Sequence, residues 1–471
     1  MRSIKLITLL SIIITALLIS PAQTQTQTPG PVYLPLVRGG NVPPVPVASY
    51  LGGSGAAAVR GVAFANDGTP LLAGRWPDDL IGGILANPLP GGEGAVVRLS
   101  FDGRTVVAAA RVGANVVDLE ASAAGPVIAC GPFGIIALPP ELDRVHWRAT
   151  PGDMRRCATD ANGAAAALVG NRVYLYQANG TAEANWLVPG TSVADLALDA
   201  TTGLVFVTGY SQKTSALKVA YLRAYSRSGN LRWTAYDFTA TAIDAARLTA
   251  DSEGRRVSMG ADGRLYLGAW TDGGNSILGR DPLDMNRTPL ATELIKFDGY
   301  NNPFNLSGAK SLAWYGRFDP ATGRLLLGQW LLTRLDNGTG NSIGIEAVSA
   351  DATGRLLITG GSFAHMAGRT GMRFLDQTLG NYEGNETYLL VVSPDFRSRQ
   401  LWTALAAPGT AAGNSPGTGV AVFEGRLLLG ATLTPRTTTP PRGLVVTPNA
   451  LQPAPANPTT NAGYYLLMGL P

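Results

Sequence analysis

The chain has 471 residues, of which 58 are glycine and 32 proline, and 45% are hydrophobic. This composition is typical of many short strands joined by tight turns, and it argues against a helical protein. Only 15% of the residues are charged, and removal of a leader that holds Arg2 and Lys5 lowers the formal charge from +4 to +2. No basic cluster remains, so nucleic acid is excluded as an expected partner.

Residues 1–22 predict a secretory signal peptide. Arg2 and Lys5 form its charged start, residues 6–19 its apolar stretch, and residues 20–22 a cleavage site. The apolar stretch is short for a bilayer, so we expect no stable membrane span, with an uncleaved anchor as the alternative. Residues 23–44 predict a Pro/Thr/Gln-rich linker. We therefore expect a protein that is secreted or held at the cell surface.

From residue 45 onward, a four-strand pattern recurs about seven times. Its clearest unit has an alternating strand at residues 193–199 and a nearly continuous apolar strand at 204–209. Repeated four-stranded sheets are typical of a β-propeller. We therefore assign residues 45–471 to a single all-β, seven-bladed propeller with negligible helix.

Blade five leaves the blade count open. Residues 293–298 and 311–319 both resemble its third strand, which makes eight blades the alternative. We assign residues 311–319 to the blade and interpret residues 271–310 as an insertion.

The two ends of the repeat region predict how the ring closes. Residues 48–55 are a strand followed by glycines, whereas residues 463–469 are a strand with no partner after it. We expect residues 45–51 to supply the outermost strand of the last blade, because this exchange leaves no unpaired blade edge.

Two motifs resemble those of the bacterial SBBP-type seven-bladed propeller repeats. Residues 49–55, Ser-Tyr-Leu-Gly-Gly-Ser-Gly, are similar to that family's crossing from strand four to strand one. Residues 447–452, Thr-Pro-Asn-Ala-Leu-Gln, are similar to its connector before strand three. The resemblance covers most of residues 45–471 and is sharp in the first and last blades. It implies an exported propeller and brings no set of catalytic residues.

The two cysteines and two histidines limit the possible chemistry. Cys130 and Cys157 fall on neighbouring blades and could form a disulfide in an exported protein; two buried thiols are the alternative. His146 and His365 are the only histidines, which excludes a multi-histidine metal site. We expect no metal and no cofactor.

Four tryptophans recur at similar places in the predicted fourth strands: Trp147, Trp186, Trp233 and Trp402. An aromatic residue at one blade position could stack on sugars, but its recurrence favours packing between blades.

Long connections between the second and third strands predict a binding surface. They occur at residues 78–94, 272–310, 362–387 and 434–462, in blades one, five, six and seven. These blades are consecutive around a closed ring, and their loops emerge on one face, where recognition usually resides. The candidate binding residues are Trp76, Asp78, Asp79, Trp270, Asp272, Tyr300, Phe363, His365, Arg369, Arg373, Tyr382 and Arg436.

The predicted function is that of an exported, monomeric, non-catalytic binding protein for a polysaccharide or a surface protein. The alternative is a propeller enzyme that acts on glycans or uses a quinone cofactor, because residues 229–233 faintly resemble quinoprotein blades. No cluster of inward carboxylates is evident in the sequence, which argues against the enzyme. Three or more carboxylates or arginines converging on the central axis would favour it.

Overall fold

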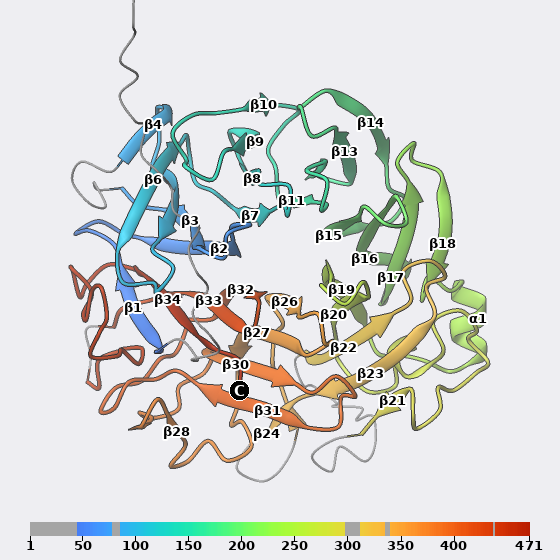
Figure 1. Ribbon diagram of the computed structural model, residues 1–471. Coiled ribbons are helices and arrows are strands. Elements are labelled where there is room, and N and C mark those ends of the chain that lie inside the picture. Colours follow the sequence, from blue (N-terminus) through green and yellow to red (C-terminus); the bar gives the residue numbers. More distant parts are fainter. Residues whose placement is uncertain (1–44, 78–84, 297–310, 335–339, 437–438) are drawn as a thin grey trace, which may run out of the picture. The chain divides into compact units, whose positions relative to one another are not determined.

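The computed structural model describes residues 45–77, 85–296, 311–334, 340–436 and 439–471. These residues form seven sheets around a common axis, so the prediction of a seven-bladed all-β propeller is confirmed (Figure 1). Helical structure in these ranges consists of α1 (Ala240–Ala245) and the 3-10 turn η1 (Ile277–Gly279). The predicted signal peptide and linker lie outside the described residues.

The blades follow one another along the chain, and each begins with its innermost strand. Blade 1 contains β2 (Ala58–Phe64), β3 (Pro70–Arg75), β5 (Gly94–Leu99), β6 (Val106–Val112) and β4 (Leu85–Leu89). Blade 2 contains β7 (Asp118–Ala121), β8 (Val127–Gly131), β9 (Gly134–Leu138) and β10 (Trp147–Ala149). Blade 3 contains β11 (Arg156–Thr159), β12 (Ala165–Val169), β13 (Arg172–Tyr176) and β14 (Ala182–Leu187). Blade 4 contains β15 (Ser192–Asp199), β16 (Leu204–Thr214), β17 (Leu217–Ser226) and β18 (Leu231–Ala235).

The remaining blades carry the longer insertions. Blade 5 contains β19 (Ser252–Met259), β20 (Leu265–Thr271), β22 (Leu312–Phe318), β23 (Leu325–Leu331) and β21 (Leu294–Ile295). Blade 6 contains β26 (Ala347–Ala350), β27 (Leu356–Ser362), β30 (Glu386–Val392) and β31 (Arg399–Ala404). Blade 7 contains β32 (Gly417–Phe423), β33 (Arg426–Leu433), β34 (Ala462–Gly469) and β1 (Val47–Leu51). Two small ribbons pair β24 (Thr333–Arg334) with β25 (Gly340–Asn341), and β28 (Arg373–Phe374) with β29 (Gln377–Thr378).

Strand direction gives the ring two different faces. The turns from strand one to two and from strand three to four emerge on one side, which we call the short-turn face. The connections from strand two to three and from one blade to the next emerge on the other side, which we call the long-loop face. On the short-turn face the connections are brief, such as residues 65–69, 122–126 and 177–181.

The insertion in blade 5 adds an edge strand and no eighth blade. β22 pairs with β20 as the third strand of the sheet, whereas β21 pairs in parallel with the outer strand β23. The assignment of residues 311–319 to the blade is therefore confirmed. β4 in blade 1 makes a similar parallel pairing with the outer strand β6, so two of the four long connections extend their own sheets outward.

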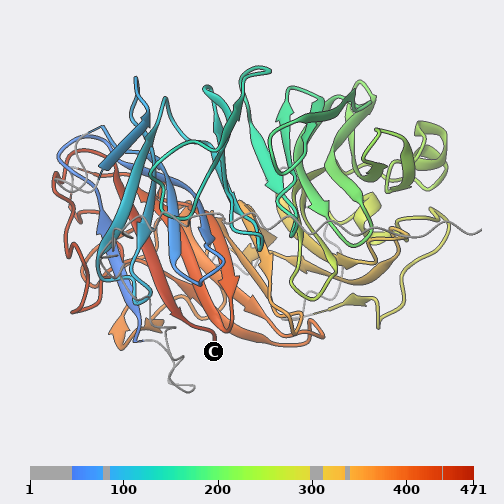
Figure 2. The ribbon, with the colours of Figure 1, turned by 45° about the horizontal axis from the view of Figure 1, so that its top comes forward.

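Strand exchange between the chain ends closes the ring, as predicted. β1 pairs antiparallel with β34, in a register that places Val47 opposite Leu467 and Tyr50 opposite Tyr464. All five residues of β1 are buried. The rings of Tyr50 and Tyr464 meet edge to face with centroids 5.7 Å apart, and the Leu444 amide donates to the Tyr50 hydroxyl at 2.7 Å. Figures 1 and 2 both show the blue N-terminal strand lying beside the red C-terminal strands.

The outer edge of β1 is covered by residues 447–452 of the connector in blade 7. The Thr447 amide donates to the Ala48 carbonyl at 3.1 Å, and the Tyr50 amide donates to the Gln452 carbonyl at 3.1 Å. The Ser49 hydroxyl accepts from the Gln452 amide at 2.9 Å. Because the free edge of a strand is prone to unwanted pairing, this connector protects the sheet that completes the ring.

Tryptophans of the fourth strands pack on glycines of the next blade. Trp147 lies against Gly180, Trp186 against Gly229 and Trp233 against Gly323. These glycines have φ between 73° and 83°, and an added Cβ at Gly323 would lie 2.6 Å from the Trp233 ring. The positive φ and the close contact both require glycine. The predicted packing between blades is confirmed for these three tryptophans, whereas Trp402 contacts Tyr388 of its own blade.

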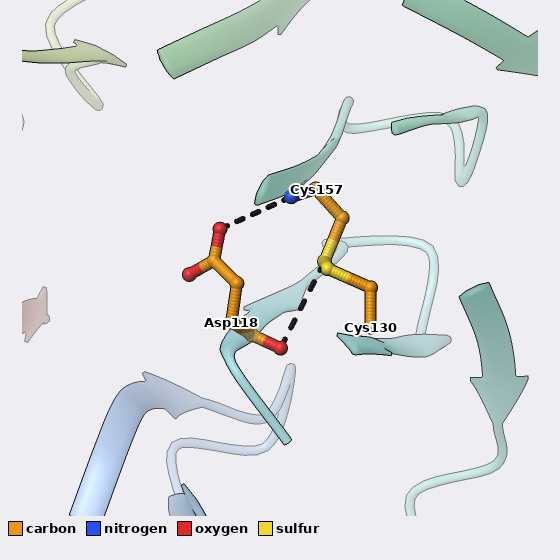
Figure 3. Close-up of side chains that lie close together, drawn as sticks. All are labelled: Asp118, Cys130 and Cys157. Atoms are coloured by element: carbon orange, nitrogen blue, oxygen red, sulfur yellow. Dashed lines mark hydrogen bonds between the residues drawn. A yellow bond between two sulfur atoms is a disulfide. The ribbon is translucent and has the colours of Figure 1, made fainter. Parts of the chain in front are cut away.

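Cys130 and Cys157 form a disulfide between blades 2 and 3 (Figure 3). Cys130 lies on β8 and Cys157 on β11, with their Cα atoms 6.2 Å apart, and both side chains are buried. The bond therefore joins the second strand of one blade to the innermost strand of the next.

Removal of β1 is expected to destabilise every blade, because it opens the ring. A chain that begins at residue 52 should unfold at a midpoint several degrees below that of a chain that begins at residue 45. Amide hydrogen exchange should also accelerate in blade 4, on the far side of the ring. Thermal unfolding followed by circular dichroism, combined with exchange mass spectrometry, would measure both effects. Identical midpoints and exchange rates would contradict a closing role for β1.

Loss of the disulfide should lower the free energy of unfolding. It closes a loop with a sequence separation of 27, for which chain entropy predicts about 2–4 kcal/mol. Urea unfolding of the Cys130→Ala/Cys157→Ala double variant should show this loss, and dithiothreitol should bring the native sequence to a similar value. Equal stability of the oxidised protein and the double variant would show that the bond contributes nothing.

Candidate functional site

Three loops on the long-loop face interlock over blades 6 and 7. They are residues 362–386 and 405–416 together with the described residues of 434–461, and we call them the crest. The Asn381 amide donates to the Thr410 carbonyl at 2.8 Å, and the Gly443 amide donates to the Ala411 carbonyl at 2.8 Å. The side chain of Gln377 donates to the Val446 carbonyl at 2.8 Å. Each crest loop is thus held by backbone groups of its neighbours.

Glu383 joins all three loops of the crest. Its carboxylate accepts from Arg436 at 2.7 Å and from Arg442 at 2.7 and 2.8 Å, both on the blade 7 loop. It also accepts from the Gly413 amide at 3.0 Å, in the connection between the blades. The hydrogen bonds from Arg442 are the main cause of the lowered pKa of Glu383, so this carboxylate stays ionised. One side chain therefore fixes the relative positions of the crest loops.

A second ion pair anchors the blade 6 loop from below. Arg369 donates to both oxygens of Glu386 at 2.6 and 2.9 Å and to the Gly380 carbonyl at 2.9 Å. Both side chains are buried, with Arg369 3% exposed and Glu386 0%. Burial raises the pKa of Glu386, and Arg369 opposes that rise. Removal of either partner would leave an uncompensated buried charge, so this pair holds the loop in one conformation.

Aromatic side chains lie above this anchor. The rings of His365 and Tyr382 stack with centroids 4.3 Å apart at a 36° tilt. Phe363, two residues before His365, is 48% exposed. Burial raises the pKa of Tyr382 to about 12, so its hydroxyl stays protonated at physiological pH. The crest thus combines an exposed apolar ring with neutral and charged hydrogen-bonding groups.

The other candidate binding residues are distributed around the ring. Trp76 is fully buried and donates to the Leu51 carbonyl at 3.2 Å, so it packs beside β1 and has no surface for a ligand. Trp270 on β20 is half-buried, donates to Glu253 at 3.0 Å and lies near Lys218. Asp272 follows it at the end of β20, and Arg373 is exposed on the β28–β29 ribbon.

Asp78, Asp79 and Tyr300 lie outside the described residues. Among the candidates with a described placement, Phe363, His365, Arg369, Arg373, Tyr382 and Arg436 all lie on crest loops.

The channel along the propeller axis holds a ring of charged residues that the sequence did not reveal. Blades 2 to 6 each contribute one charged side chain to an alternating series of signs. Together they line an axial cavity of about 80 Å3, and Arg60 of blade 1 and Glu120 of blade 2 line the same cavity. We call the alternating set the axial ring; it consists of Asp118, Arg156, Asp195, Arg256 and Glu346.

Two glycines complete the axial ring in blades 7 and 1. Gly419 and Gly61 occupy the corresponding strand position, immediately after a β-bulge. An added Cβ at Gly61 would lie 2.9 Å from the Leu119 backbone nitrogen, and one at Gly419 would lie 3.1 Å from that of Val62. The inner strands approach each other too closely here for a side chain at this position in blades 7 and 1.

The axial carboxylates serve the contacts between blades. Asp118 accepts from the Cys157 amide at 3.1 Å, as Figure 3 shows, and Asp195 accepts from the Val257 amide at 3.0 Å. In both cases the donor is the amide of the residue that follows the axial arginine on the innermost strand of the next blade. Arg156 lies 4.0 Å from Asp118 and 3.9 Å from Asp195. Much of the axial ring is therefore structural.

Arg256 and Glu346 continue this set of contacts between blades 5 and 6. Their charged groups lie 2.8 Å apart, and the Arg256 guanidinium also donates to the Glu346 carbonyl. This pair links the innermost strand of blade 5 to the residue just before β26.

The described part of the chain offers one grouping of possible metal ligands, Asp118 with Cys130 and Cys157. Its two sulfur atoms are joined in the disulfide, so neither is a thiolate that could bind a metal ion. This grouping does not support a metal site.

The sequence matches no family model, and it matches none of the curated proteins. Over the described ranges, no helix combines the length and apolar character that a membrane crossing requires. The fold itself defines the class: a seven-bladed β-propeller closed by a strand from its N-terminal end, with a rigid crest on one face and a charged ring at its axis.

Asp195 is expected to make stability depend on pH. Burial raises its pKa to about 6, although Arg156 and Arg256 oppose the rise. The protonated carboxyl of Asp195 is therefore favoured in the folded state relative to the unfolded state. Because the proton is lost as pH rises from about 4 to 7, the contribution of Asp195 to stability falls over this range. The free energy of unfolding of the native sequence, relative to that of Asp195→Asn, should fall by up to about 3 kcal/mol over this range. Urea unfolding at four pH values would measure it, and parallel profiles for the two proteins would refute the prediction.

Proposed function

We propose that this protein is an exported, non-catalytic binding propeller that recognises a polysaccharide through the crest. The observation that carries the proposal is the junction at Glu383, where one carboxylate accepts hydrogen bonds from Arg436, Arg442 and the Gly413 amide. Loops fixed before a ligand arrives lose little conformational entropy on binding, which is the usual requirement for recognition by loops.

The exposed groups of the crest suit a sugar chain. Phe363 offers an apolar ring to the C–H face of a sugar, and such rings are frequent at wet, polar binding surfaces. Tyr382 supplies a protonated hydroxyl close by, and Arg373 an exposed cation. A surface protein is the other ligand class that this mixture could recognise. Binding of a protein and of no polysaccharide would replace this part of the proposal.

Export has two supports of different kinds. Residues 1–22 have the pattern of a secretory signal, and the Cys130–Cys157 disulfide is compatible with an oxidising compartment. The motifs at residues 49–55 and 447–452 resemble those of exported SBBP-type propellers, and their mutual hydrogen bonds at β1 agree with a shared role in ring closure.

One observation favours the alternative function, that of a propeller enzyme. Carboxylates and arginines do converge on the axis, which is the arrangement that would favour catalysis. However, Asp118 and Asp195 accept from backbone amides of the next blade, and Glu346 is paired with Arg256. Because these groups hold the blades together, the binding function is the better supported of the two.

Two crest substitutions test the proposal. The purified protein would be incubated with insoluble cell-wall polysaccharides, and the bound fraction measured against concentration. Phe363→Ala and Tyr382→Ala should each weaken binding about tenfold, equivalent to about 1.4 kcal/mol, and leave the unfolding midpoint nearly unchanged.

Phe101→Ala is the matched control, because Phe101 is 46% exposed but lies in a turn of the short-turn face. Its binding should equal that of the native sequence. Unchanged binding by a Phe363→Ala/Tyr382→Ala double variant would remove the crest as the recognition surface.

A further inference from the structure

A cavity of about 520 Å3 opens on the short-turn face, opposite the crest. All seven blades contribute to its lining. The lining residues are 62–66, 120–123, 159–161, 198–201, 258–261, 263, 348–350 and 420–423. These residues are the second halves of the innermost strands and the turns that follow them. We call this cavity the axial funnel, and its floor adjoins the smaller cavity of the axial ring through shared residues such as Val62 and Glu120.

Alanine is the commonest residue in the walls of the axial funnel. Nine alanines line it: Ala63, Ala65, Ala121, Ala123, Ala161, Ala200, Ala261, Ala350 and Ala421. Their small side chains leave the width of the channel open, and six of them present methyl groups to whatever enters, whereas Ala63, Ala65 and Ala350 are buried. Serine and threonine hydroxyls interrupt this surface, and Phe64 and Phe423 form a ring pair with centroids 5.9 Å apart. The funnel can therefore hold an aliphatic chain.

The charges of the axial funnel have one sign. Its lining contains Glu120, Asp160 and Asp199 and no lysine, arginine or histidine. Asp160 accepts from two backbone amides and Arg227, and Asp199 accepts from the amides and a hydroxyl of its own turn. Among the described contacts, the Glu120 carboxylate has neither a hydrogen bond nor an ion pair. It is the remaining unpaired charge of the funnel and lies at its floor.

We propose that the axial funnel binds a primary ammonium group on an unbranched aliphatic chain, with the ammonium at Glu120 and the chain along the alanine walls. The negative charges of the funnel lining favour a cation, and the apolar walls favour one with a hydrocarbon stem over a bare metal ion. A free alkylamine and a lysine side chain of a partner protein present the same chemistry. This site lies on the opposite face from the crest and does not depend on polysaccharide binding.

The surroundings of Glu120 make the site responsive to pH. Glu120 is exposed to the cavity, and loss of hydration inside the channel raises its pKa well above the ordinary value, with further increases from Asp118 and Asp195 and a decrease from Arg156. An ammonium ion beside it would favour the ionised form and displace the proton. Affinity should therefore rise with pH until Glu120 is fully ionised, because the amine itself stays charged through this range. The other charged groups that face Glu120 across the two cavities are Arg60, Arg256, Glu346, Asp160 and Asp199.

Calorimetric titration with n-pentylamine tests the site. The native sequence should bind the amine at pH 8, and the affinity should fall at least tenfold at pH 5. Glu120→Gln should weaken binding at pH 8 at least tenfold and remove the pH dependence. The matched control is Glu93→Gln, since Glu93 is a 43% exposed carboxylate outside the funnel lining, and it should bind like the native sequence.

Other ligands and a substitution in the funnel wall test the proposal further. Pentanol and pentanoate should not bind, and Ala123→Trp, at an exposed alanine of the funnel wall, should obstruct the amine without unfolding the protein. The affinities of Nα-acetyl-lysine methylamide and n-pentylamine should be compared, because the first represents a lysine side chain of a protein and the second a free amine. Tighter binding of either compound supports the site. Equal affinity of Glu120→Gln and the native sequence, binding of pentanoate, or displacement of the amine by equimolar calcium would each overturn the proposal.

Discussion

The pairing of β1 with β34 is the interaction on which the whole molecule depends. Each blade is a twisted sheet that buries its faces only against its two neighbours, so seven blades are stable as a ring and much less stable as an open arc. Five buried residues of β1 complete the last sheet, and residues 447–452 cover the edge that would otherwise stay open. The two segments that define the closure are thus in contact with each other, although they lie at opposite ends of the chain.

Contacts between neighbouring blades stabilise the closed ring along its whole circumference. On the outside, Trp147, Trp186 and Trp233 each lie on a glycine of the next blade. At the axis, Asp118 and Asp195 each accept from an amide of the next inner strand. A rigid scaffold of this kind explains how two faces of different chemistry can coexist. One face carries interlocked loops with an exposed phenylalanine ring, and the other a funnel with alanines in its wall and an unpaired carboxylate.

The sequence predicted features that local patterns determine, and it missed those that depend on tertiary contacts. Strand alternation, turn glycines and the unpaired terminal strands are local patterns, so the blade count and the closure followed from them. β21 has two residues and pairs only because an outer strand lies beside it, so no pattern marks it. Trp76 was expected at the surface, but its indole turns back to the Leu51 carbonyl. Asp195 and Arg256 of the axial ring were missed because bulges at Ala194 and Arg255 shift the alternation of their inner strands by one residue. The detectable sign was a charged residue at, just before or within a short inner strand that is otherwise mostly small and apolar, repeated in neighbouring blades.

The position of β1 also imposes an order of events on biosynthesis. Val47 pairs with Leu467, so the strand that emerges first among the described residues must wait for a partner made 420 residues later. During this interval a segment that is fully buried in the finished protein is exposed, while six blades can already assemble. The final sheet therefore forms only after β34 has been made, and a chain that stops before Ala462 keeps an apolar strand without its partner at one end and an open blade at the other. Such a product exposes an unpaired strand edge, and edges of this kind are prone to pair with other chains.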